Sequence, residues 1–75
     1  MTRHLTTVIE REGEGEGYVA WCPALDIASQ GETVETARAN LEEAIALFIE
    51  TAAPTEIAAR TKAEVFVTEV EVAIG

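Results

Sequence analysis

The hydrophobic pattern of this 75-residue chain changes its period once, close to Gly31. Before that point, short apolar stretches alternate with polar residues or stop at glycine and proline, which is typical of strands. After it, apolar residues recur every three to four positions, as on one side of a helix. This stripe consists of Val34, Ala37, Leu41, Ala44, Ile45, Phe48 and Ala52. The pattern therefore predicts a small sheet packed against an amphipathic helix.

Three strands are predicted before the change of period, and short connections make neighbouring strands antiparallel. Their predicted ranges are Arg3 to Glu12, Tyr18 to Cys22 and Asp26 to Gln30. The glycine-rich run 13–17 is suited to a hairpin loop between the first two strands. Pro23 and Gly31 mark the ends of the second and third strands.

The predicted helix carries signals at both ends. The Thr33 hydroxyl can accept a hydrogen bond from a free N–H of the first turn, and Glu35 favours the same end through the helix dipole. Pro54 is expected to stop the helix near Ala53. The next segment, residues 55–62, has two interpretations: a second short helix opened by Pro54, or a linker.

A final strand is predicted from Glu64 to Ile74, where apolar and polar residues alternate. Its apolar side carries Phe66, Val70, Val72 and Ile74. The expected fold is thus α+β with the order β-β-β-α-β in a single domain, residues 1–75. A helical crossover makes the fourth strand parallel to the first and third, which gives a mixed four-stranded sheet with one helix packed on one face.

One helix cannot cover both faces of this sheet, and an uncovered apolar face commonly marks an interface. The candidate interface residues are Tyr18, Trp21, Val65 and Val67. A chain this short rarely builds a sufficient core alone, and its one cysteine, Cys22, excludes an intrachain disulfide. Self-association, most simply as a homodimer, is therefore expected.

No constellation of catalytic, cofactor-binding or metal-binding residues is found. His4 and Cys22 are the only histidine and cysteine, which is too few for a zinc site and leaves a nucleophilic pair without an orienting acid. Glu12, Glu14 and Glu16 alternate with glycine and lack the pattern of a calcium loop. The chain is therefore not expected to be an enzyme, and Cys22 is expected to pack as a small buried hydrophobe.

The net charge of −9 indicates which partners the chain can attract. Direct nucleic-acid binding is not expected, because it depends on positive charge, whereas a basic protein surface would be attracted. No stretch approaches the roughly 20 apolar residues of a membrane span, and the N-terminus has no signal-peptide pattern. A lone thiol without an export signal fits the cytoplasm.

The segment from Tyr18 to Glu50 resembles the HicB family of antitoxins. The similarity lies in an aromatic strand running into Cys22-Pro23, in the run Ile27-Ala28-Ser29-Gln30-Gly31, and in the helix opened by Glu32-Thr33. Ala37, Asn40, Leu41, Ala44 and Ile45 continue the rhythm of that family's helix.

The resemblance implies a degenerate ribonuclease-H-like fold, with the fourth strand beside the first and without the metal-binding acids of a nuclease. It also implies a partner, a small basic HicA-type toxin that cleaves messenger RNA and whose active site the antitoxin blocks. The sequence departs from the family at Asp26, where many members carry glycine. It also ends at Gly75, before the family's C-terminal DNA-binding domain would begin, so operator binding by this chain is not expected.

Two functions from different classes follow. The first is an antitoxin domain that occludes a basic ribonuclease by protein–protein contact. The second is a solitary structural or regulatory module that oligomerises through its open sheet face. A small-ligand or metal-binding protein is the third and least favoured reading.

Overall fold

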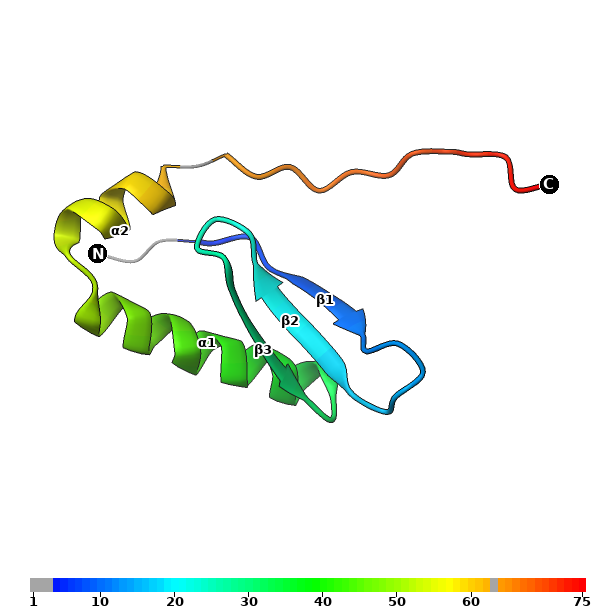
Figure 1. The fold of residues 1–75 in the computed structure, drawn as a ribbon, viewed down its shortest axis with the longest axis horizontal. Helices are drawn as coiled ribbons and strands as arrows, with labels where there is room; N and C mark the ends of the chain where they lie inside the picture. The colour runs from blue at the N-terminus through cyan, green and yellow to red at the C-terminus, as the bar shows by residue number, and fades with distance from the viewer. Residues whose placement is uncertain (1–3, 63) are drawn as a thin grey trace.

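The computed structural model describes residues 4–62 and 64–75 (Figure 1). Its elements are β1 (Val8–Arg11), β2 (Tyr18–Cys22), β3 (Ile27–Gly31), α1 (Val34–Thr51) and α2 (Pro54–Thr61). The three strands form one antiparallel sheet in the order β1-β2-β3, so β2 is central and both other strands are edges. The expected α+β class and antiparallel pairing are confirmed, and β1 starts at Val8, later than predicted.

Two tight connections set the register of the sheet. In the glycine-rich loop, the Glu12 N–H donates to the Gly17 carbonyl at 2.9 Å, which closes the hairpin in which Val8 faces Trp21. Between β2 and β3, the Asp26 N–H donates to the Cys22 carbonyl at 2.9 Å. Asp26 has a φ of 55°, in the left-handed region that glycine adopts without strain. Asp26 is thus the non-glycine residue, among those described, that adopts a conformation favoured by glycine.

Helix α1 begins where the sequence predicts. The Thr36 N–H donates to the Thr33 hydroxyl at 3.0 Å, which satisfies one free donor of the first turn. The helix ends at Thr51, two residues before the predicted end, with Ala52 as its C-cap. Of the two interpretations of segment 55–62, the helical one is confirmed: the second helix, α2, begins at Pro54 and ends at Thr61.

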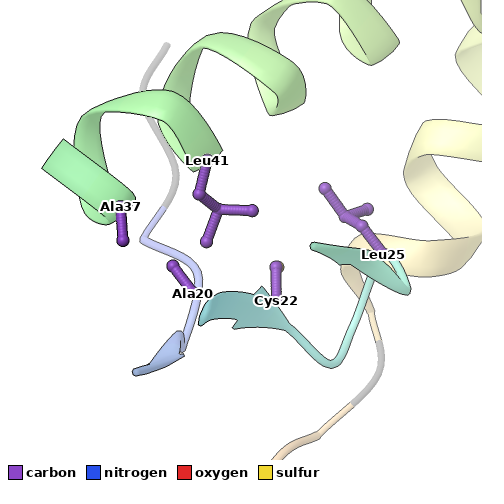
Figure 2. Packing of buried hydrophobic residues seen from close by; sticks show 5 residues of the cluster. All are labelled: Ala20, Cys22, Leu25, Ala37 and Leu41. Atoms are coloured by element: carbon purple, nitrogen blue, oxygen red, sulfur yellow. The ribbon is translucent and has the colours of Figure 1, made fainter. Parts of the chain in front are cut away.

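The core lies between α1 and the sheet (Figure 2). Among the described residues it consists of Ala20, Cys22, Leu25, Ala37 and Leu41, all at most 1% exposed. Small residues let α1 approach β3 closely: a Cβ on Gly31 would lie 2.5 Å from the Ala37 backbone nitrogen. At the same place the Asn40 side-chain amide donates to the Gln30 carbonyl at 2.8 Å, which fixes α1 to the β3 edge. The prediction that Cys22 is a small buried hydrophobe is confirmed.

The predicted fourth strand is wrong in this structure. Residues 64–75, here called the C-terminal arm, form no strand and run away from the sheet after α2 (Figure 1). Alternation favours extended backbone, but a strand also needs an edge to pair with, and the arm reaches none within its own chain. The described fold therefore has three antiparallel strands and two helices, in place of a mixed four-stranded sheet with one helix.

The arm makes the molecule unusually extended for its length. The radius of gyration is 14.4 Å, whereas a compact chain of this length would have about 11 Å. The large apolar side chains of the arm are all at least 68% exposed, apart from the half-buried Val65. Ile74 near its end reaches 94%. Neither described helix has the length and apolar character needed to cross a bilayer.

Candidate interaction surfaces

The open face of the sheet is the first candidate surface. Strand alternation turns Val8, Glu10, Val19, Trp21 and Ala28 away from α1, where they line a shallow hollow of about 260 Å³. Trp21 is 42% exposed there. An indole partly open to solvent offers a large apolar area and one N–H donor, which suits a protein contact.

Tyr18 lies on the opposite, helix-covered face of the sheet. It is half-buried and packs beside the core, on the same side as Ala20. The Arg11 guanidinium donates to the Tyr18 hydroxyl at 2.9 Å and lies 5.0 Å from the centre of its ring. Tyr18 and Trp21 therefore lie on opposite faces of the sheet. A partner that binds the open face would contact Trp21 and not Tyr18.

Val65 and Val67 lie in the C-terminal arm, and neither lines the hollow beside Trp21. Val65 is half-buried and Val67 is 70% exposed. The four predicted interface residues thus occupy three separate places: the covered face, the open face and the arm. Their shared role in an interface stays a prediction.

A groove beside β1 is the second candidate surface, and the sequence did not indicate it. Helix α1 lies mainly over β3 and β2, which leaves space between α1, α2 and the segment that leads into β1. The groove has a volume of about 530 Å³. Its walls are Leu5, Leu41, Ile45, Ile49 and Ile57, with His4, Thr7, Arg38, Glu42 and Thr61 at polar positions. An apolar groove of this shape fits an extended or helical peptide segment.

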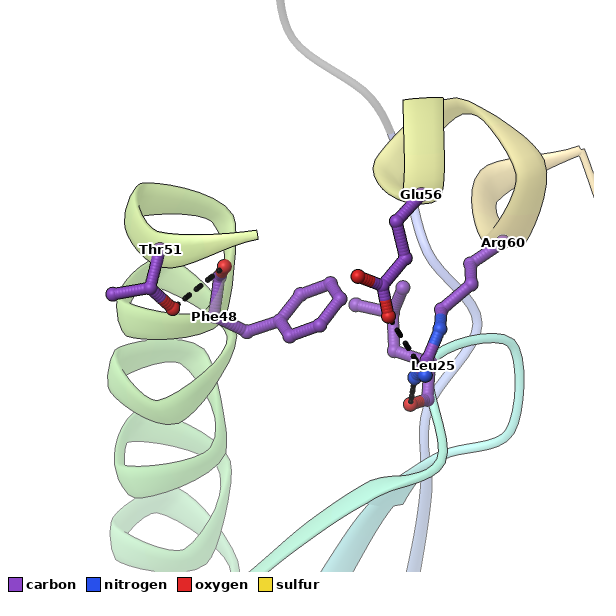
Figure 3. Close-up of polar contacts among 5 residues, drawn as sticks. All are labelled: Leu25, Phe48, Thr51, Glu56 and Arg60. Atoms are coloured by element: carbon purple, nitrogen blue, oxygen red, sulfur yellow. Dashed lines mark hydrogen bonds and ion pairs between the residues drawn. The ribbon is translucent and has the colours of Figure 1, made fainter. Parts of the chain in front are cut away.

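Helix α2, which contributes Ile57 and Thr61 to this groove, is linked to its neighbours by Arg60 (Figure 3). Its guanidinium donates to the Leu25 carbonyl at 2.7 Å, pairs with the Glu56 carboxylate at 3.0 Å and lies 5.2 Å from the centre of the Phe48 ring. One side chain therefore connects α2 to the β2–β3 turn and to α1. Sequence reasoning missed this residue, although the spacing of Glu56 and Arg60 is that of an ion pair on a helix.

Negative charge predominates in this chain, which has fourteen Asp and Glu residues against five Lys and Arg residues. Among residues 4–62 and 64–75, the Arg60–Glu56 contact is the one ion pair formed. The acids of α1, Glu35, Glu42, Glu43 and Glu50, are all exposed. Acidic side chains without a paired cation produce a negative field that favours encounter with a basic surface.

The two residues considered for nucleophilic chemistry have different surroundings. Cys22 is fully buried in the core, and His4 is exposed at the groove. In the part of the chain that the structure covers, no three side chains of His, Cys, Asp or Glu gather into a group able to hold a metal ion.

Comparison with known proteins gives one informative relative. No family model and no solved structure matches the chain. The UPF0150 protein ssr1765 of Synechocystis is 50% identical to it over 46 residues, which is 60% of this chain and 57% of the relative. The match thus spans little more than half the length of that protein. A half-identical stretch of this length identifies the two proteins as homologous over the shared segment.

Proposed function

We propose that this chain is an antitoxin domain that binds a small, basic, HicA-type ribonuclease and occludes its active site. The observation that carries the proposal is the HicB-like segment from Tyr18 to Glu50. In the structure this segment comprises β2, β3 and most of α1, the elements between which the core is formed. The residues of the resemblance are therefore those that build the body of the domain.

Charge supports the same proposal. Occluding an RNA-cleaving enzyme requires a surface that competes with a phosphate backbone for basic residues, and exposed carboxylates do this by complementarity. A net charge of −9 and four exposed acids on α1 supply such a surface. The action proposed is binding alone, because no catalytic step by this chain is needed to block the active site.

The test is inhibition of RNA cleavage by a purified HicA-type toxin. We expect cleavage of a messenger RNA substrate to fall as the chain is added and to stop once the antitoxin is in excess. A matched variant, Glu42→Lys/Glu43→Lys, should inhibit less while keeping the melting temperature of the parent. If the folded parent neither binds the toxin nor changes the cleavage rate, the antitoxin proposal fails.

A second function, a solitary self-associating module, is favoured by the exposed arm and by Trp21. The two are distinguished by adding the toxin: an antitoxin binds it, whereas a solitary module changes only its own oligomeric state.

A further inference from the structure

Within the described residues, the C-terminal arm has no partner strand, and the outer edge of β1 has no neighbouring strand. The arm is an extended segment of strand-forming residues without a partner, and it exposes Phe66, Val70, Val72 and Ile74 on one side. β1 is an edge strand whose outer backbone groups are unpaired in the sheet, and the apolar groove lies next to it. Unpaired strand edges readily accept an added strand.

We propose that the arm of one copy of this chain pairs with the outer edge of β1 in a second copy, and that the second copy returns its own arm in the same way. The exchange buries the apolar side of the arm in the partner's groove and completes a four-stranded sheet in each body. This proposal concerns self-association and does not depend on the antitoxin function.

Length and pattern fit this arrangement. Residues 64–74 span about 36 Å when extended, enough to cover the outer edge from Leu5 to Arg11. Alternation gives the arm one side with Phe66, Val70 and Val72, which suits the isoleucine-lined groove. The opposite side of the arm then falls on the open face of the sheet. There Val65 and Val67 would extend the apolar area around Trp21, as the sequence prediction of a shared interface requires.

A second copy is the occupant we favour over the arm of the same chain. Only two residues separate Thr61, at the end of α2, from Glu64, and short connections of this kind favour exchange between copies. Arg60 bonds α2 to the β2–β3 turn, and the arm runs outward beyond α2 (Figure 1). The arm therefore does not fill the groove beside β1 of its own chain. Reciprocal exchange about a two-fold axis occupies both grooves and both arms at once, so the assembly closes as a dimer.

Disulfide trapping between differently tagged chains tests the exchange. One chain carries Glu10→Cys on β1, and the other carries Glu69→Cys or Glu71→Cys on the arm, which allows for two registers. Cys22 stays in all chains, because it is buried. After mixing and mild oxidation, we expect a disulfide that joins the two tags. Ala46→Cys, on the exposed side of α1, is the control and should give no joined product with Glu10→Cys.

A chain carrying both Glu10→Cys and Glu69→Cys, oxidised at low concentration, distinguishes exchange between two copies from pairing of the arm with β1 of its own chain. A disulfide within one chain, together with no joined product from the mixed single variants, would show that the arm folds back on its own body and would overturn the proposal. Sedimentation supplies the second readout. The parent should sediment as a dimer of the 8.0 kDa chain, and an 8.0 kDa monomer at micromolar concentration also overturns the proposal.

A proline in the arm tests the backbone pairing directly. In an edge strand only alternate N–H groups face the neighbouring strand, so Val70→Pro and Glu71→Pro are tested in parallel. One of the two removes a ladder donor and should weaken the dimer at least about tenfold. Glu69→Gln, one position away, keeps the donor and should leave the dimer at least as tight as the parent. Equal dimerisation of the parent and both proline variants would exclude strand pairing by this part of the arm.

Discussion

The Arg60 side chain contacts three separate parts of a domain whose core is small. It joins α2 to the β2–β3 turn through the Leu25 carbonyl, and to α1 through the Phe48 ring. Hydrogen bonds made by a charged donor are stronger than neutral ones, and a planar guanidinium can serve several partners at fixed angles. These contacts tie α2 to the rest of the domain.

Removing the guanidinium should therefore loosen α2. We expect Arg60→Ala to lower the free energy of unfolding by about 2 kcal/mol, measured by urea denaturation. Arg60→Lys should recover part of the loss, because it keeps the charge but cannot reach all three partners. An alanine variant as stable as the parent would show that packing by Ile57 alone holds α2.

Asp26 offers a second test on the scale of one residue. A left-handed φ costs a residue with a Cβ roughly 1–2 kcal/mol, and an aspartate is tolerated there better than most because its short polar side chain can bond locally. We expect Asp26→Ala to destabilise the fold by about 1 kcal/mol and Asp26→Gly to leave it equal or more stable. Thermal melts of the three proteins decide this, and a glycine variant less stable than the alanine variant would contradict it.

At the scale of elements, helix α1 is stabilised along one line of contact with the sheet. Leu41 is 1% exposed and Leu47 is 57% exposed on the same helix. Since both are leucines with the same helix propensity, they form a matched pair. Leu41→Ala should cost about 3 kcal/mol by creating a cavity, whereas Leu47→Ala should change stability by about 0.5 kcal/mol or less.

The measurement is a denaturant titration of both leucine variants at two protein concentrations. The opposite ranking would mean that the helix is rotated about its axis relative to the sheet. A concentration-dependent loss in Leu47→Ala alone would place a second chain over that side of α1.

The elements predicted correctly are those with local signals. Thr33 and the apolar stripe located α1, and the run from Tyr18 to Cys22 ended at Pro23 as expected. The fourth strand failed because alternation is a local property, whereas pairing requires an edge elsewhere in the fold or in another molecule. The bond from Arg60 to Leu25 joins residues 35 positions apart, and the groove that it helps to form has no sequence pattern of its own.

On the scale of the whole molecule, charge should affect how fast a basic partner is met. Exposed carboxylates contribute mainly through long-range attraction, which salt screens over about 10 Å at 0.1 M. We expect the association rate constant with a HicA-type toxin to fall at least about tenfold between low and physiological salt, while the dissociation rate constant changes little. Stopped-flow measurement across a salt series checks this, and an association rate unaffected by salt would sink electrostatic steering.

The hairpin loop between β1 and β2 projects at the end of the sheet farthest from α2 (Figure 1). Its residues 12–16 are all exposed, and two backbone hydrogen bonds, at 2.9 and 2.8 Å, hold its shape without any contribution from the core. Exposed loop tips of this kind accept inserted sequence with little effect on the fold. A fluorophore attached to this loop can therefore follow the arm without altering the sequence of the arm or the packing of the core.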